Sequence, residues 1–371
     1  MNSRDIARWR MRNQRLSGPG CTTADEVVGW LGAVQSQDYG PAQWSVAQRT
    51  PGLSQADLEQ AFNVGAIVRT HVLRPTWHFV RPADIRWMLK LTRPRVQVMS
   101  AHGERREGLD RAVFKQSFEA LGRALEGGRH LTRAELGACL QQAGVVAQAG
   151  RLGHILMRAE LEGLICSGAR KGKQHTYALL DERVPAAPSL RHEEALRELT
   201  VRYFTSHGPA SARDFHWWSS LSMAEVRHGI ELAGSLLDSD AVDGVTYWFA
   251  ASGPPNTTGG QQAHLLHMFD EYVVGYSETR RAFDADGIGW SLFQTINERQ
   301  GVLTIDGQVK GTWRRTLSRD EVLVEARLYA PLDSVQSGEL RAETDRFGAF
   351  VGLPARLQLN GADSLALRSR T

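Results

Sequence analysis

The chain has 371 residues, of which 42% are hydrophobic and 23% are charged, and its formal net charge at pH 7 is +3. This composition is that of an ordinary soluble protein, and the length exceeds what one hydrophobic core usually holds, so two or three domains are expected. Because the net charge is small, an anionic partner would have to be bound by local basic patches, and because no stretch approaches the roughly 20 consecutive apolar residues of a spanning helix, no membrane contact is expected.

The N-terminus and the cysteines indicate a cytoplasmic protein. The segment "MNSRDIARWRMRNQRL" alternates charged residues with single apolar ones and has neither the apolar core nor the cleavage site of a signal peptide. The three cysteines, Cys21, Cys139 and Cys166, are far apart in the sequence and form no CxxC pair. A reducing compartment and no structural zinc are therefore expected.

Capping signals mark the starts of several short helices. A Ser or Thr is followed three residues later by Asp or Glu at Thr23, Ser54, Thr132, Ser211 and Ser222. The hydroxyl can accept a hydrogen bond from a free N–H of the first turn, and the acidic side chain favours the positive end of the helix. In the N-terminal third, helices are predicted at about 23–34, 41–49 and 54–64. They lead into the β-prone segment "IVRTHVLRPTWHFV", which is expected to form a hairpin.

The middle of the chain repeats this order of elements. The segments "LTRAELGACLQQAGV" and "RLGHILMRAELEGLI" predict two helices, and "ICSGARKGKQHTYALL" predicts a hairpin with a basic tip. Helix, turn, helix and basic hairpin is the order of a winged helix-turn-helix unit. A third copy runs from "ASARDFHWWSSLSMAEVRHGIELAG" to "VTYWFA". Within it, Trp217 and Trp218 are helical neighbours about 100° apart, so one is expected in the core and the other at the surface.

These patterns predict an α+β fold with three tandem winged helix-turn-helix units and a mostly β C-terminal module. The predicted parts are a first winged-helix unit at 1–81, connecting helices at 82–127, a second unit at 128–184, a third unit at 185–252 and the β module at 263–371. The segments "DERVPAAPSL" and "ASGPPNTTGGQQ" are the expected linkers. In the β module, Asp306-Gly307 between alternating residues is typical of a tight hairpin turn.

The adjacent acids Asp270 and Glu271 are expected at the end of a strand, in "HMFDEYVVGY". Adjacent residues of a strand point to opposite faces, so the two carboxylates are a poor candidate for concerted acid–base chemistry. We expect them to bind Arg280 or Arg281 instead.

Common catalytic signatures are absent from the sequence. There is no GxxxxGK[ST] phosphate loop, no GxSxG nucleophile motif and no HExxH metal motif. Neither a cofactor nor a metal ion is therefore expected.

Basic side chains are gathered where a DNA backbone could be met. The candidates for DNA contact lie in predicted hairpins or on one helix face: Arg69, His71, Arg74, Arg151, Arg170, Lys171, Lys173, Lys310, Arg314 and Arg315. A strand period of two puts Arg69 and His71 on one face, which could meet a ligand, and residues 170–173 form a hairpin tip that could meet phosphates. A solvated tip explains each basic patch about as well, and a structural hydrogen-bond network explains the histidines.

The junction "GWLGAVQSQDYGPAQW" places two neutral amides, Gln35 and Gln37, between an apolar helical run and a Gly-Pro turn. Residues two apart lie about 200° apart on a helix but share a face in an extended chain. The two amides can therefore converge only if the helix ends near Val34. Without further information, the glutamines could simply cap a helix C-terminus.

Five segments together resemble a known family. The segments "AVQSQDYGPAQW", "RTHVLRPTWHFV", "GARKGKQHTYAL", "FDEYVVGY" and "VKGTWRR" occur in the order and spacing of the AlkZ/YcaQ family of winged-helix DNA glycosylases. The resemblance spans nearly the whole chain and implies that the winged helices form a concave surface for duplex DNA. It also implies that Gln35 and Gln37 are the catalytic pair. Some members have Asp at the second position, so Gln37 favours the AlkZ-like, crosslink-processing type.

The activity implied by this resemblance is hydrolysis of the N-glycosidic bond of purines alkylated at N7 or N3, including bases in interstrand crosslinks left by DNA-alkylating antibiotics. Such a base is cationic and leaves without being protonated, so amides that orient a water and face the developing charge suffice. No lysine nucleophile is recognisable, which favours a monofunctional glycosylase. A crosslinked base cannot rotate freely into a deep pocket, so a shallow, open site is expected.

The expected partner is double-stranded DNA that contains alkylated or crosslinked purines, in a bacterial cytoplasm and at the nucleoid when DNA is bound. No obligate protein partner is evident. The role would be DNA repair or resistance of a producer to its own toxin. Two alternatives remain open: a non-catalytic winged-helix DNA-binding protein, such as a regulator or damage sensor, and a scaffold that binds no DNA.

Overall fold

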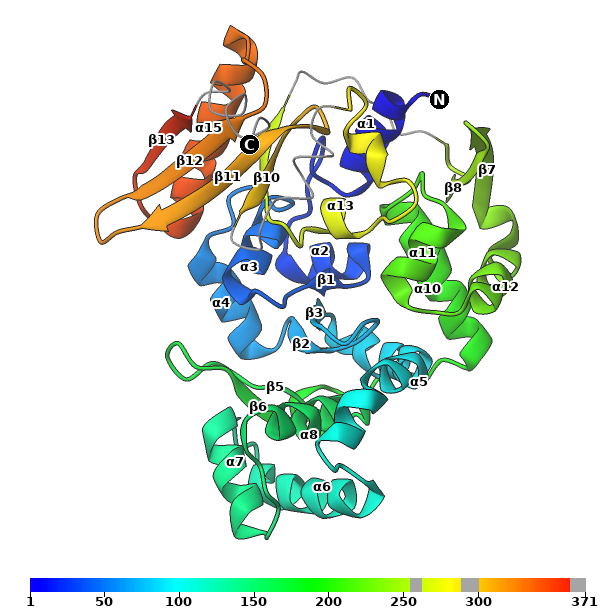
Figure 1. Ribbon diagram of the computed structural model, residues 1–371, viewed down its shortest axis with the longest axis vertical. Coiled ribbons are helices and arrows are strands. Elements are labelled where there is room, and N and C mark those ends of the chain that lie inside the picture. Colours follow the sequence, from blue (N-terminus) through cyan, green and yellow to red (C-terminus); the bar gives the residue numbers. More distant parts are fainter. Residues whose placement is uncertain (254–261, 288–299, 361–371) are drawn as a thin grey trace, which may run out of the picture.

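The computed structural model describes residues 1–253, 262–287 and 300–360 (Figure 1). In these residues the chain has a mixed α+β fold, with small sheets near the N-terminus and in the middle and a larger sheet near the C-terminus. Within the same ranges, no helix combines the length and the hydropathy that crossing a membrane requires.

The N-terminal part consists of helices and a small sheet, in the predicted order. Its helices are α1 (Ser3–Asn13), α2 (Ala24–Leu31), α3 (Tyr39–Ala47) and α4 (Gln55–Val64). Its strands are β1 (Val34–Gln35), β2 (Val68–His71) and β3 (Trp77–Val80), and they form a sheet in the order β1-β3-β2. The helices predicted after residue 20 and the hairpin at 67–80 are confirmed.

The first of these helices ends three residues earlier than predicted, at Leu31 instead of Val34. Helix α2 stops at Leu31 because Gly32 follows with a φ of 84°, a conformation that glycine adopts without strain. Residues Val34 and Gln35 then pair with Phe79 and His78 of β3. The segment that carries the two glutamines therefore leaves the helix, as the convergence of their amides requires.

Two long helices and a second small sheet follow. Helices α5 (Pro82–Arg106) and α6 (Arg111–Leu125) confirm the predicted connecting helices. The next elements are β4 (Leu131–Thr132), α7 (Arg133–Gln142), α8 (Ala149–Leu161), β5 (Ile165–Ser167) and β6 (Thr176–Leu179), with the sheet order β4-β6-β5. The predicted helices and basic hairpin are thus present. A short helix, α9 (Leu180–Arg183), occupies the start of the first predicted linker.

The third helical segment ends in a two-stranded sheet. Its elements are α10 (His192–Ser206), α11 (Ala212–Ser219), α12 (Met223–Ala233), the 3-10 turn η1 (Gly234–Leu236), β7 (Leu237–Val242) and β8 (Val245–Ala250). Trp218 is completely buried, whereas Trp217 is 47% exposed. This difference confirms the prediction that the two neighbours divide between core and surface.

The C-terminal module is a five-stranded sheet with one long helix. The strands β9 (Ala263–Leu266), β10 (Gly301–Ile305), β11 (Gln308–Leu317), β12 (Val322–Leu328) and β13 (Ala355–Asn360) have the order β13-β12-β11-β10-β9. Helix α15 (Ser334–Val351) packs against β9 and β13, and α13 (Glu271–Val274) and η2 (Arg280–Phe283) follow β9. Asp306 and Gly307, with φ of 50° and 71°, make the predicted hairpin turn. Most of the second predicted linker lies outside the described residues.

The predicted parts share hydrophobic cores. The Trp44 ring of α3 lies 5.0 Å and 5.2 Å from the rings of Phe347 and Phe350 of α15, which joins the N-terminal part to the C-terminal module. Another core joins α5 to α10, α11 and α12. Helix α1 contributes Met11 to a cluster with Leu266 of the C-terminal sheet. The segment around the two glutamines is therefore supported by elements from both ends of the sequence.

Candidate active site

Gln35 is held by both its backbone and its side chain. Its backbone N–H donates to Oε1 of Glu271 at 2.8 Å. Its side-chain Oε1 accepts a hydrogen bond from Nη2 of Arg74 at 3.0 Å. Only 7% of the residue is exposed, so a ligand can reach only a small part of this amide.

Gln37 lies two residues further along, in the bend between β1 and α3, and is exposed. Its Oε1 accepts a hydrogen bond from the backbone N–H of Trp77 at 3.3 Å. The intervening Ser36 donates its backbone N–H to the carbonyl of Trp77 at 2.7 Å. Both glutamine side chains thus bind the β2–β3 hairpin, Gln35 at Arg74 of the connection and Gln37 at Trp77, the first residue of β3.

Donor-only partners determine the orientation of both amides. An arginine side chain and a backbone N–H can only donate, so the atom that faces each of them must be the carbonyl oxygen. Within the part of the chain that the structure describes, neither NH2 group donates to a protein acceptor. Both NH2 groups therefore remain available to a bound molecule, and each carbonyl oxygen keeps one lone pair.

A pocket of about 660 Å³ opens beside Gln37. Residues before α5 contribute Gln37, Tyr39, Arg69 and Trp77 to its lining. Residues of the middle segment contribute the rest, including Thr132, Arg133, Leu152, Lys173, His175 and Tyr177. The volume is in the range of small-molecule sites, and the rings of the lining offer flat apolar surfaces.

The prediction for Asp270 and Glu271 was wrong. Asp270 is the N-cap of α13 and Glu271 is its first residue, so the chain turns here instead of continuing as a strand. Neither carboxylate binds Arg280 or Arg281, and Arg280 donates to a backbone carbonyl instead. The spacing of Ser or Thr to Asp or Glu that marks other helix starts is absent here, since Val273 follows Asp270 by three residues, and four residues are too few to produce a helical pattern.

Asp270 binds Arg49, two residues after the end of α3, deep in the protein. The guanidinium donates to both carboxylate oxygens at 2.8 Å, and both side chains are completely buried. Burial disfavours the carboxylate, but the charge and hydrogen bonds of Arg49 outweigh burial and hold the pKa of Asp270 below 3.8. This ion pair joins α3 to the turn that carries Glu271.

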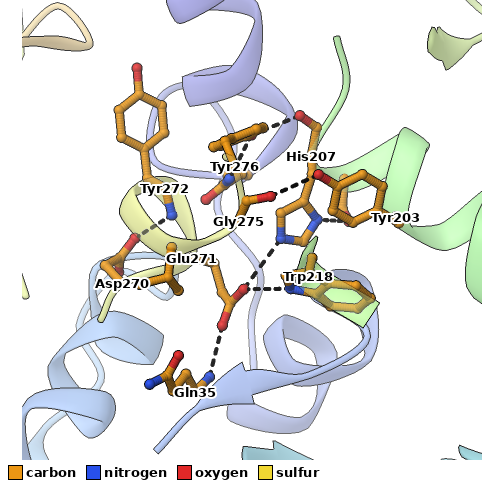
Figure 2. Close-up of polar contacts among 12 residues, drawn as sticks. Gln35, Tyr203, His207, Trp218, Asp270, Glu271, Tyr272, Gly275 and Tyr276 are labelled. Carbon is orange, nitrogen blue, oxygen red and sulfur yellow. Dashed lines mark hydrogen bonds and ion pairs between the residues drawn. The ribbon is translucent and has the colours of Figure 1, made fainter. Parts of the chain in front are cut away.

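Glu271 contacts the segment that carries the two glutamines, residues 35–37, through the backbone of Gln35. Figure 2 shows its carboxylate between the backbone N–H of Gln35 and the indole N–H of Trp218, each 2.8 Å away. The ring of His207 lies near the same carboxylate, with Nε2 at 3.5 Å from Oε2. Sequence reasoning named Glu271 but gave it the wrong partners, because the observed ones come from β1, from α11 and from the residue after α10, all distant in the chain.

Arg69 and His71, predicted to face a ligand, are 7% and 5% exposed. The Nε of Arg69 donates to the carbonyl of Ser36 at 3.1 Å, and its guanidinium lies 4.3 Å from the centre of the Trp77 ring. Burial lowers the pKa of Arg69 to about 10. The ring of His71 binds Glu160 of α8 through Nδ1. Both side chains therefore brace the glutamine segment and the hairpin from within.

The basic tip of the β5–β6 hairpin is partly engaged in ion pairs. Arg170 lies 3.2 Å from Glu59 and is half-buried, whereas Lys171 is exposed and lies 2.9 Å from Glu135. Lys173 is exposed and lines the pocket beside Gln37. An exposed ion pair is worth little, so Lys171 can exchange its partner for a phosphate.

The other predicted basic residues do not line this pocket. They have partners elsewhere or lie in a second pocket of about 310 Å³: Arg151 with the carbonyl of Glu107, Lys310 with Asp286, Arg314 with Glu325, and Arg315 in the second pocket. The structure therefore brings together Gln35, Gln37, Arg69, Arg74 and Lys173, and leaves these four outside.

Stability should fall as the pH is lowered from 7 to 5, with His78 contributing about 2 kcal/mol of the loss. His78 is completely buried, its Nδ1–H donates to the carbonyl of Thr76 at 2.9 Å, and burial followed by the charge of Arg74 lowers its pKa to about 3. The unfolded chain binds a proton at this histidine near pH 6.5 and the folded chain does not, so stability is lost below pH 6.5. Urea unfolding at both pH values measures the loss in the wild type, in His78→Gln and in the control His192→Gln, which changes an exposed position. Equal losses in the wild type and His78→Gln would contradict this assignment.

Comparisons with known proteins identify the family. Residues 28–350 match the family described as "DNA glycosylase AlkZ-like". A protein of Streptomyces sahachiroi named "Interstrand DNA cross-link repair glycosylase" is 25% identical over 328 residues, which cover 84% of this chain and 87% of that protein. The structure of Streptomyces sahachiroi DNA glycosylase AlkZ has the same fold, with a TM-score of 0.78 and 21% identity over 96% of this chain and 100% of that chain. Because the family match spans most of the sequence, this chain belongs to the AlkZ-like DNA glycosylases.

Proposed function

We propose that this chain hydrolyses the N-glycosidic bond of purines made cationic by alkylation at N7 or N3, and that it unhooks interstrand crosslinks formed at such purines by DNA-alkylating antibiotics. The observation that carries the proposal is the pair Gln35 and Gln37, held at the β2–β3 hairpin with both NH2 groups free. The name of the Streptomyces relative supports a crosslink as substrate. The biological role would be DNA repair or self-resistance to a toxin.

The chemistry of such a base suits neutral amides. When the C1′–N bond breaks, both electrons leave with the cationic base, which becomes neutral, and the positive charge passes to the sugar. A water then adds to C1′ and releases a proton to the solvent. An amide can orient that water and turn its carbonyl dipole to the cation without being a strong base. The product is an abasic site, and no covalent enzyme intermediate is needed.

The two glutamines differ in exposure, and we assign them different roles. Gln37 is exposed and lines the pocket, so it contacts the damaged nucleotide and positions the water. Gln35 is nearly buried and its carbonyl oxygen binds Arg74, so its NH2 group holds an oxygen of the sugar or its phosphate.

The pocket beside Gln37 is the proposed place of the alkylated base. Tyr39, Trp77 and Tyr177 line it, and aromatic rings are the usual surface against which a nucleobase stacks. The base would enter between the part of the chain before α5 and the β5–β6 hairpin.

We infer that three segments are winged helices: 1–81, 128–184 and 185–252. Each carries helices followed by a hairpin, and the series α7, α8, β5 and β6 has the order of such a unit. Residues 82–127 would connect the first two units, and 263–371 would form the mostly β C-terminal module. Together the units would present a concave surface to duplex DNA, with Lys171, Lys173 and Arg314 among its exposed basic side chains.

Duplex DNA with a single 7-methylguanine tests the activity. Incubation followed by hot alkali should break the strand at the modified base, and untreated DNA should stay intact. Borohydride should trap no protein–DNA adduct, because a monofunctional enzyme forms no Schiff base. Duplexes crosslinked through purine N7 or N3 should separate into single strands that carry abasic sites. DNA that is bound but never becomes alkali-sensitive would reject hydrolysis and support a non-catalytic DNA-binding protein.

Removing the two exposed lysines of the hairpin tip should weaken DNA binding mainly through loss of phosphate contacts. In Lys171→Ala with Lys173→Ala, the slope of log affinity against log salt concentration should become shallower by about 2, for damaged and undamaged DNA alike. Fluorescence anisotropy between low and physiological salt measures the slope. Lys90→Ala, at an exposed position of α5, is the matched control. An unchanged slope in the double variant would exclude the tip from the DNA interface.

A further inference from the structure

Glu271 is a buried carboxylate directly behind the glutamine segment. Its Oε1 accepts the backbone N–H of Gln35 and its Oε2 accepts the indole N–H of Trp218, both at 2.8 Å. The residue is completely buried, and Figure 2 shows its side chain extending from α13 to these two donors. Glu271 thus connects the main chain of Gln35 to the C-terminal module and to α11.

Glu271 lacks the cationic partner that its neighbour has. Asp270 forms two hydrogen bonds with the guanidinium of Arg49, but among the residues that the structure describes no Lys or Arg side chain contacts Glu271. Its remaining contact is with His207, at 3.5 Å. A buried charge without a paired ion is costly, so such a group is rarely kept for stability alone.

His207 does not supply the missing charge near pH 7. The hydroxyl of Ser206 donates to the carbonyl of Arg202 at 2.7 Å and lies 2.9 Å from Nδ1 of His207. Burial lowers the pKa of His207 below 6.5, although Glu271 opposes the shift. The ring is therefore neutral near pH 7 and gives Glu271 no full positive charge.

The carboxylate of Glu271 stays ionised. Burial disfavours its charge, but the contacts with His207, the charge of Arg74 and the N–H of Gln35 outweigh burial and keep the pKa below 4.5. Arg74 donates to the Gln35 side chain and not to Glu271. The two charged groups therefore bind opposite ends of one residue, Arg74 at the amide oxygen and Glu271 at the main chain.

We propose that Glu271 is a positioning residue for base excision: it fixes the main chain of Gln35 and places an unpaired negative charge behind the amide that meets the sugar. This inference rests on the proposed function. As the C1′–N bond breaks, the base takes both electrons and C1′ becomes cationic; a fixed negative charge that is itself buried behind Gln35 favours this change. Glu271 forms no bond and exchanges no proton, because water supplies the oxygen and releases the proton to solvent.

Two DNA duplexes with abasic-site analogues test the charge directly. One carries a pyrrolidine ring, which is cationic at the sugar, and the other a neutral tetrahydrofuran ring of similar shape. The wild type should bind the cationic duplex about tenfold more tightly, and Glu271→Gln should reduce this preference to about twofold or less. Glu271→Asp keeps the charge and should retain most of the preference. Single-turnover excision of 7-methylguanine at saturating enzyme should fall about 10- to 100-fold in Glu271→Gln and recover in part in Glu271→Asp.

A second buried glutamate provides the matched control. Glu343 of α15 is 5% exposed, lies beside Arg346 and has no contact with the glutamine segment, so Glu343→Gln should leave the binding preference and the excision rate unchanged. An unchanged preference for the cationic duplex in folded Glu271→Gln overturns the inference. An equal loss of affinity for both duplexes, together with a lowered melting temperature, also overturns it, because it would mean that Glu271 has a purely structural role. If Glu271→Gln does not fold, a wild type without preference for the cationic duplex overturns it. A wild type that leaves 7-methylguanine in place rejects the proposed function, whereas normal excision by Glu271→Gln rejects only this inference.

Discussion

Replacing both Gln35 and Gln37 by alanine should reduce the excision of 7-methylguanine by at least about a hundredfold. The two amides are the groups assigned to the water and the sugar, and both bind the β2–β3 hairpin, Gln35 at Arg74 and Gln37 at Trp77. Affinity for undamaged duplex DNA should stay within about threefold of the wild type, because binding to the backbone depends on basic side chains. Single-turnover kinetics at saturating enzyme and anisotropy titrations measure the two quantities.

The single variants separate the assigned roles of the pair. Gln37→Ala should lose rate without loss of stability, since Gln37 is exposed. Gln35→Ala should also lower the free energy of unfolding by about 1–3 kcal/mol, because it leaves Arg74 without its acceptor. The control Gln358→Ala removes an exposed glutamine of β13 and should change neither quantity. A parallel loss of DNA affinity and rate in the double variant would assign the pair to recognition instead of catalysis.

Arg49→Met should lower the free energy of unfolding by about 3–5 kcal/mol, the effect of breaking a buried ion pair at one partner. The substitution leaves Asp270 charged and buried, and it also removes hydrogen bonds from the guanidinium to the carbonyl of Gln14 and to Ser45. Because the pair joins α3 to the turn that carries Glu271, excision should fall together with stability. Urea denaturation measures the first effect and single-turnover kinetics the second.

Arg356→Met is the matched control for Arg49→Met. Arg356 lies 3.1 Å from Glu321 with its side chain 55% exposed, so its loss should change the unfolding free energy by no more than about 1 kcal/mol. Similar losses in both variants would show that the buried pair contributes nothing beyond a surface contact.

The two neighbouring acids show why the support of the site could not be predicted from the sequence. Asp270 and Glu271 stand side by side in the chain, yet one binds Arg49 and the other binds Gln35 and Trp218. The sequence offered basic residues ten positions away as partners, and local spacing favoured them. The observed partners depend on how α3, β1 and α11 pack around α13, and that packing has no local sequence pattern.

Local sequence patterns predicted the exposure of some of the basic residues correctly and that of others wrongly. Lys171 and Lys173 are exposed at a hairpin tip, as the Gly- and Lys-rich segment indicates. His71 lies in an equally polar segment, but its ring is buried against Glu160 of α8. Strand alternation shows which residues share a face, but whether another element covers that face is decided by tertiary contacts.

The sequence by itself determined the order of the helices and hairpins, because capping residues, glycine turns and apolar periodicity act over a few residues. It also singled out Gln35 and Gln37, through a Gln-x-Gln segment and a family resemblance that the family match now supports. Only the tertiary structure decided how their amides are oriented, which pocket Gln37 lines and that an unpaired carboxylate lies behind Gln35. Those features arise from contacts between residues up to 236 positions apart, where burial and the choice of hydrogen-bond partner depend on the packed chain as a whole.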